Sequence, residues 1–183
     1  MTSALLRGKD LIGKPVVDIA TGTLQAEIRD VVFDAAAGSI TGFTLRKPGF
    51  LGRRLKAVLA IDSVRSVGAD AVIVETAGLL ANPDDVPEAS GEDKADVVGD
   101  RVITESGRVL GELRDVVIVG GRSARVVGFE IGGGPPGDGL IPIAAASGLS
   151  GSSLIVPDIY EQRIRTDLTG LAAELATIEK DRT

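Results

Sequence analysis

The chain has 183 residues, a mass of 18.8 kDa and a formal net charge of −6 at pH 7. It contains neither cysteine nor histidine, which excludes disulfides, thiolate nucleophiles, His-dependent triads and the common zinc sites. No apolar run approaches the roughly 20 residues that a transmembrane helix needs, and the first residues lack the layout of a signal peptide. We therefore expect a cytoplasmic protein that holds no metal and no cofactor.

Short apolar segments separated by turn residues fill the first half of the chain. They predict strands at residues 15–19, 25–34, 39–45, 57–61 and 71–76. Turn signals such as Thr21-Gly22 lie between these segments. Because aromatic residues make up only 3% of the chain, we expect Phe33, Phe43 and Phe129 to be the large anchors of the core.

The second half repeats the pattern of the first. EIRDVV at residues 27–32 returns as ELRDVV at residues 112–117, and Gly42-Phe43 returns as Gly128-Phe129 in the same order. The corresponding strands are predicted at residues 101–104, 109–119, 124–131, 139–143 and 153–157. This order indicates a duplicated unit. Units with about five short strands tend to close into small antiparallel barrels, because closure removes exposed sheet edges.

The repeated Arg-Asp pair interrupts the alternation of its strand. The apolar positions change parity at Arg29-Asp30 and again at Arg114-Asp115. A one-residue change moves every following side chain to the other face, so we predict a β-bulge or a barrel bend at each pair. A charged docking surface is the alternative interpretation.

The remaining segments complete the predicted domain organisation. Residues 79–96 carry two prolines and six acids, the composition of a solvated linker. After it, Asp158 or Asp167 is expected to cap an amphipathic helix, whose stripe covers a barrel or pairs with a second copy or a partner helix. The stripe consists of Ile164, Leu168, Leu171, Leu175 and Ile178. The predicted domains are 1–78, the acidic linker 79–96, 97–157, and the helix and tail 158–183.

Two loops at equivalent places in the repeat differ. The first unit has RKPGFLGRRLK at residues 46–56, and the second has GGGPPGDG at residues 132–139. The basic loop is a candidate contact surface for an acidic protein, anionic lipid or RNA phosphate, although a solvated hairpin explains it equally well. The glycine-rich loop lacks the Gly-Lys-Ser/Thr of a phosphate loop, so we expect a flexible or tight turn. The candidate contact residues are Arg46, Lys47, Phe50, Leu51, Arg53, Arg54 and Lys56.

These motifs resemble the PRC-barrel family. The family pattern is a start like Leu11-Ile12-Gly13-Lys14-Pro15-Val16-Val17-Asp18, a strand ending in Asp-Val-Val, then Ile-x-Gly-Phe and a final Ala-Val-Ile-Val. The first copy fits over about residues 5–76, and the second fits more loosely over about residues 97–157, including Leu140-Ile141-Pro142. The resemblance implies a non-enzymatic domain, as in reaction-centre H subunits, a ribosome maturation factor and archaeal cell-division proteins that dock other proteins. Neither the membrane helix of the H subunit nor the first domain of the maturation factor is expected here.

Together these patterns predict a mainly β protein of two tandem small antiparallel PRC-like barrels with a C-terminal amphipathic helix. The expected function is a non-enzymatic adaptor or scaffold that binds a protein partner. A membrane-associated complex is one setting in which such an adaptor could act. The alternative is an RNA- or ribosome-associated maturation factor that uses the basic loop 46–56. A homodimer through the C-terminal helix and peripheral contact of the loop with membrane or RNA are further partner hypotheses. No small-molecule substrate is inferred.

Overall fold

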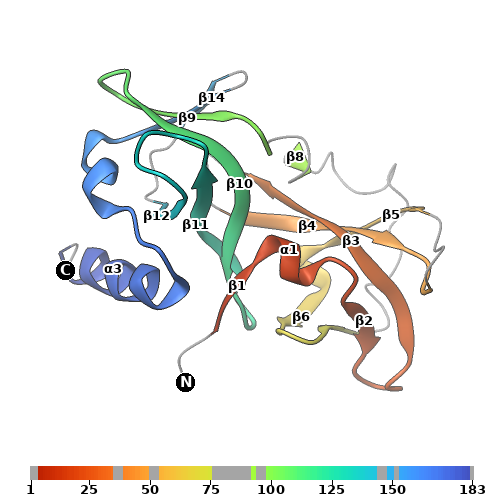
Figure 1. Ribbon diagram of the computed structural model, residues 1–183. Coiled ribbons are helices and arrows are strands. Elements are labelled where there is room, and N and C mark those ends of the chain that lie inside the picture. The colour runs from red at the N-terminus through yellow and green to blue at the C-terminus, as the bar shows by residue number, and fades with distance from the viewer. Residues whose placement is uncertain are drawn as a thin grey trace.

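The computed structural model of the chain describes residues 4–34, 39–49, 54–75, 92–93, 98–143, 148–150 and 153–181. It is mainly β, with one long helix at the C-terminal end (Figure 1). The elements of the first half are β1 (Leu5–Arg7), α1 (Gly8–Leu11), β2 (Pro15–Asp18), β3 (Leu24–Asp34), β4 (Ser39–Arg46), β5 (Arg54–Ala60), a 3₁₀ helix (Ile61–Ser63), β6 (Val64–Val67) and β7 (Val72–Val74).

The second half follows with a similar set of strands. These elements are β8 (Glu92–Asp93), β9 (Arg101–Thr104), β10 (Val109–Val119), β11 (Arg125–Gly132), β12 (Gly139–Pro142), β13 (Gly148–Ser150), β14 (Ser153–Val156), a 3₁₀ helix (Asp158–Arg163) and α3 (Leu168–Asp181). All ten predicted strands are present, with ends that differ by up to three residues. The short strands β1, β6, β8 and β13 were not predicted.

The strands form one curled, mixed sheet in which the two halves have the same strand topology. The order is β13-β14-β9-β10-β11-β4-β3-β2-β7-β6, and β12 and β5 pair with β11 and β4. In each half the last predicted strand returns beside the first and runs parallel to it, β7 on β2 and β14 on β9. The prediction of antiparallel pairing fails at these two pairs, because consecutive hairpin spacing conceals the return of the last strand. Closure into two separate barrels stays a prediction.

The predicted bulges are confirmed at both Arg-Asp pairs. The register between β3 and β4 shifts between Ile28 and Asp30, and the register between β10 and β11 shifts between Leu113 and Asp115. Arg29 and Arg114 are thus the extra residues, and both side chains are exposed. Because the shift restores the inward parity of the apolar residues on each side, the long strands bend without exposing their core face.

A single apolar cluster joins the two halves. Phe33, Phe43 and Phe129 are each at most 1% exposed, as the scarcity of aromatic residues predicted. The rings of Phe33 and Phe129 lie 6.4 Å apart, within the usual range of aromatic contacts. The same cluster includes Val16 from β2 and Val102 from β9, so the core is shared across the halves.

The repeated Gly-Phe step is explained by close strand packing. A Cβ on Gly42 would lie 2.4 Å from the Leu59 carbonyl oxygen, and one on Gly128 would lie 2.6 Å from the Ile141 carbonyl oxygen. Both distances are far below contact distance, so glycine is required where β5 and β12 approach β4 and β11.

The leading strand of each half pairs with the long strand of the other half. β1 lies antiparallel to β10 with Leu6 opposite Ile118, and β8 lies antiparallel to β3 with Glu92 opposite Phe33. These are equivalent positions of the repeat, so each half contributes its leading strand to the long strand of the other half. We call this arrangement the reciprocal exchange of leading strands. The two halves are therefore held together by backbone hydrogen bonds as well as by the shared core.

The Asp of the repeated motif fastens this exchange on the β10 side. Asp115 is 1% exposed, and its carboxylate accepts hydrogen bonds from the backbone N–H groups of Lys9 and Val116, both at 2.9 Å. Lys9 belongs to α1, which Figure 1 shows against β10 and β3. A carboxylate at the start of a short helix satisfies an otherwise unpaired backbone donor.

Glu130 on β11 adds two ion pairs to the same junction. It accepts hydrogen bonds from Arg7 Nε at 2.5 Å and Lys9 Nζ at 3.0 Å. Burial raises the pKa of the Glu130 carboxyl, but the hydrogen bonds and positive charges of Arg7 and Lys9 lower it further, so the pKa lies below the ordinary value of 4.5. The carboxylate is therefore held in its ionised form.

This lowered pKa predicts a specific acid sensitivity. A carboxyl whose pKa is depressed by folding stabilises the fold above its unfolded pKa and loses that contribution as the pH falls through the folded pKa. We expect the difference in unfolding free energy between the wild type and Glu130→Gln to be constant above about pH 6 and to shrink below about pH 4.5. Urea unfolding at a series of pH values measures it. Glu105→Gln, at an exposed position, is the control, and an equal pH profile for both variants would contradict the assignment.

Candidate functional site

An open groove lies between α3 and the sheet of the second half. Its volume is about 550 Å³. The sheet side is formed by β1, the end of β10, the β10–β11 turn and the start of β11, and the helix side by residues of α3 between Ala172 and Glu179. The lining includes Leu5, Val119, Val127, Ala172, Leu175 and Ala176, with Arg122, Arg125 and Glu179 among the polar residues.

The helix is placed by a small apolar cluster of its own. Leu171 is fully buried against Val117, Val127 and Leu140, and Leu168 and Leu175 pack at the edge of this cluster. The predicted stripe therefore covers the sheet of the second half, one of the two alternatives that the sequence left open. Ile178 is half-buried.

The start of the helix differs from the predicted stripe. α3 begins at Leu168, and Asp167 Oδ1 accepts the Gly170 N–H at 2.7 Å. Asp167 is therefore the cap, and Asp158 instead begins a 3₁₀ helix. Ile164 lies before α3, so its inclusion in the helical stripe was wrong. The reason is the neighbouring Arg165, whose backbone exchanges hydrogen bonds with Leu140 of β12 and so continues the sheet.

A buried carboxylate secures the other side of the helix. Glu174 is 9% exposed and pairs with Arg163 at 3.0 Å and with Arg165. Both arginines lie in the segment that leads into α3, so the ion pairs hold the helix against the segment that precedes it. This segment is itself bridged to β12 through Arg165 and Leu140, so the ion pairs help to anchor α3 to the sheet of the second half.

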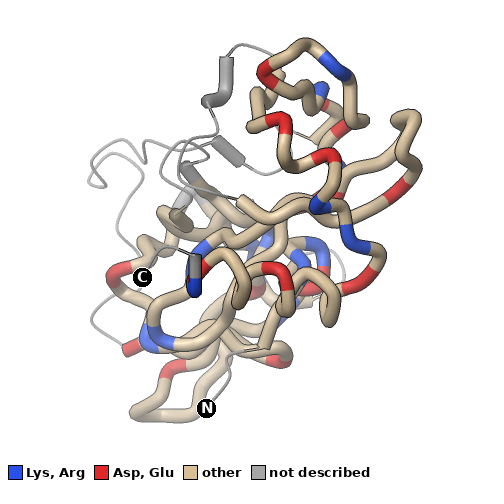
Figure 2. The backbone as a smooth tube through the Cα atoms, turned by 90° about the vertical axis from the view of Figure 1, so that its left-hand side faces the viewer, with Lys and Arg blue, Asp and Glu red and all other residues tan. Residues whose placement is uncertain are grey.

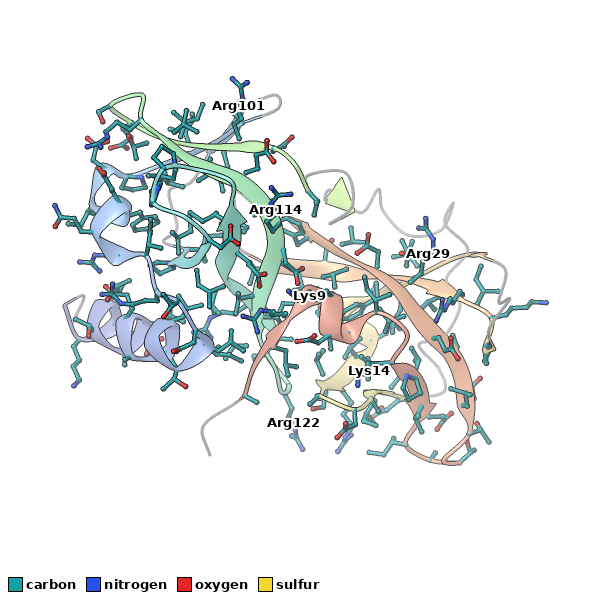
Figure 3. All side chains as sticks on the ribbon, viewed as in Figure 1. Lys9, Lys14, Arg29, Arg101, Arg114 and Arg122 are labelled. Atoms are coloured by element: carbon teal, nitrogen blue, oxygen red, sulfur yellow. The ribbon has the colours of Figure 1, made fainter. Side chains whose placement is uncertain are left out.

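The rim of the groove carries two arginines and one glutamate. Arg125 and Glu179 lie 3.4 Å apart, with side chains 56% and 71% exposed. Arg122 is exposed at the tip of the β10–β11 hairpin and points away from the body of the molecule (Figure 3). No hydrogen bond or ion pair joins its side chain to another residue that the structure describes.

Figure 2 shows the molecule from the side that carries α3. Basic and acidic residues alternate along the described backbone there and do not gather into a large patch of one sign. The local charge at the groove is therefore set by the few charged residues of its lining.

The predicted contact loop 46–56 is described only in part. Arg46 Nε lies 3.0 Å from Glu27 Oε2, and Glu27 also accepts the Gly49 N–H, so Arg46 is engaged within the fold. Lys47 is exposed. Phe50, Leu51 and Arg53 lie outside the described residues, and Arg54 and Lys56 are described only as backbone of β5.

The glycine-rich loop of the second half is a tight turn. A Cβ on Gly134 would lie 2.0 Å from the Leu110 carbonyl oxygen. The loop therefore lies directly on the backbone of β10, with no room for a phosphate at that position.

The carboxyls with shifted pKa values do not suggest acid–base chemistry. The Ser106 N–H and hydroxyl and the Thr104 hydroxyl hold the pKa of Asp158 below its ordinary value, and the pKa of Glu130 is also lowered. A general acid at neutral pH needs a raised pKa, so neither carboxyl is suited to that role, and both accept hydrogen bonds within the fold. Within the described residues there is no cluster of three metal-ligating side chains.

The described part of the chain contains the α-helices α1 and α3. Neither combines the length and the apolar character that crossing a bilayer requires.

The sequence did not reveal the groove. Its walls come from Leu5, from the turn at Arg122 and from α3, which are far apart in the chain. The one available signal was the hairpin turn Gly120-Gly121-Arg122-Ser123, whose arginine stands at a tip.

Comparison with known proteins agrees with the first half of this architecture. Residues 5–80 match the family model of the PRC-barrel domain. The match covers the stretch from β1 past β7 and confirms the resemblance of the first copy. For the second copy, residues 97–157, the resemblance stays a prediction. No curated protein matched the chain.

Proposed function

Residues 5–80 form a PRC-barrel domain, and from this premise we propose that the chain is a non-catalytic adaptor that binds a protein partner. The observation that carries the proposal is the groove of about 550 Å³ between α3 and the β10–β11 hairpin. Its apolar lining with a few charged groups is the usual composition of a binding site.

The architecture around the groove suits a docking surface. β1, which contributes Leu5 to the lining, is paired to β10 and fastened through α1 by Asp115. The helix wall is fixed by Leu171 and Glu174. A site whose walls are held in place loses little conformational entropy when a partner binds.

The basic loop 46–56 remains a second proposed contact, and protein is the partner we favour for it. Nothing in the described part of the loop favours RNA or membrane, because Arg46 is already paired with Glu27. A homodimer through the complete stripe of α3 is disfavoured, since Leu171 is buried within its own chain.

Site-specific cross-linking in cells tests the proposal. A photoreactive amino acid replaces Ala176 in the groove, Lys47 at the start of the loop, or Thr21 on a distant exposed turn as the control. We expect one reproducible protein adduct from Ala176 or Lys47 that is missing from Thr21 and that co-purifies with the unmodified full chain. If neither test position gives an adduct beyond the control, the adaptor proposal is wrong.

A further inference from the structure

We propose that the groove accepts an apolar segment of a protein partner that carries acidic side chains toward the β10–β11 hairpin. The identity of the partner as a protein rests on the proposed function, whereas the preference for acidic over basic segments follows from the groove itself.

The floor of the groove selects apolar side chains. Leu5, Val119 and Leu175 are half-buried at the margin of the Leu171 cluster, so each still presents surface to the groove. On the helix wall Ala172 and Ala176 are exposed and small, which leaves room for another chain between helix and sheet. Filling this space removes apolar surface from water on both partners.

The rim selects the sign of the charge. Arg122 makes no hydrogen bond or ion pair with a residue in the described part of the chain, and Arg125 makes a long, exposed contact with Glu179. An exposed pair of this kind stabilises a protein very little, so an incoming carboxylate can compete with Glu179 for Arg125 at little cost. Guanidinium groups bind carboxylates with paired hydrogen bonds.

The same rim disfavours a basic segment. With two arginines and one glutamate, a lysine from the partner would meet at least one uncompensated guanidinium, and like charges at an interface are a common means of rejecting a wrong partner. An RNA phosphate would find the arginines but would leave the apolar floor unfilled.

A titration with matched synthetic peptides tests this inference on the full-length chain. Two amphipathic peptides share one apolar stripe and differ only in carrying glutamate or lysine beside it. We expect the acidic peptide to shift the methyl NMR signals of Leu5, Val119, Val127 and Leu175 and to bind roughly tenfold more tightly than the basic one, as expected for one charge-assisted contact. The preference should weaken as salt is raised.

Two pairs of variants localise the effect. Ala176→Trp fills the groove and should abolish the methyl shifts, whereas Ala173→Trp, at an exposed position on the same helix that does not line the groove, should leave them unchanged. Arg122→Glu should remove the preference for the acidic peptide. Arg101→Glu makes the same charge change on β9, at the opposite end of the view in Figure 3, and should leave the preference unchanged. Circular dichroism confirms that each variant is folded.

Several outcomes would overturn the inference. These are equal affinity for both peptides, no methyl shifts with either, insensitivity to Ala176→Trp, or binding only to anionic phosphatidylglycerol vesicles. The adaptor proposal and this inference can fail separately. An adduct from Lys47 without one from Ala176 would retain the adaptor proposal and reject the groove as the docking surface.

Discussion

Replacing Asp115 with alanine is expected to lower the free energy of unfolding by about 2–4 kcal/mol, because buried donors that lose a charged acceptor keep their desolvation cost. The carboxylate of Asp115 accepts the N–H groups of Lys9 and Val116 at a position that is 1% exposed. Alanine cannot replace either bond, and the site admits little water to do so. Chemical denaturation of the full chain measures the loss.

Two comparisons separate this role from a general effect of losing an acid. Asp115→Asn keeps one acceptor oxygen and places an amide NH₂ against a donor, so we expect an intermediate loss. Asp10→Ala removes an exposed carboxylate from the same short helix and should change stability by no more than about 0.5 kcal/mol. In Asp115→Ala the amide of Lys9 should exchange with solvent faster than in Asp10→Ala. Equal stability of the two alanine variants would show that Asp115 does not secure the junction.

Replacing Leu171 with alanine is expected to cost about 2–4 kcal/mol where α3 meets the sheet, the range for deleting a buried leucine side chain. Leu171 is fully buried, and its cluster with Val117, Val127 and Leu140 is separate from the main core. The damage should therefore be local. Hydrogen exchange should accelerate through α3 and at Leu140, while the amides of β3 and β4 keep their protection.

The control for this variant is Thr169→Ala on the exposed side of α3. It should leave exchange in the helix nearly unchanged. If Leu171→Ala instead lowers the protection of β3 and β4 as much as that of α3, the helix belongs to the global folding unit. If neither variant alters exchange in α3, the packing at Leu171 does not hold the helix.

Local patterns in the sequence predicted the local features of the fold. The parity change at Arg29 and Arg114 was sufficient to locate the bulges at these two residues, because an extra residue restores the buried face of the strand. The second register shift in each strand pair, at Val32/Phe33 and at Val117/Ile118, was not predicted. The burial of Phe33 and Phe129 was expected because aromatic side chains are scarce in this sequence. Asp167 was one of two candidate caps, and only its hydrogen bond to Gly170 distinguished it from Asp158.

The features that escaped prediction depend on contacts between distant segments. β1 and β8 have three and two residues, too few to show an alternating pattern, and their partners lie in the other half of the chain. Ile164 has the spacing of the helical stripe, but the bridge from Arg165 to Leu140 keeps it out of the helix. The groove likewise exists only once β1, the hairpin and α3 have been brought together.

The reciprocal exchange of leading strands has a consequence for how the protein is made. β1 pairs with β10, and the Lys9 amide donates its hydrogen bond to Asp115, which is synthesised 106 residues later. At about 5–20 residues per second, this delay is about 5–20 s of synthesis. During that time β1 has no β10 to pair with. Pairing of β1 therefore depends on synthesis of the second half, and a chain that stops before β10 would leave β1 without its partner strand.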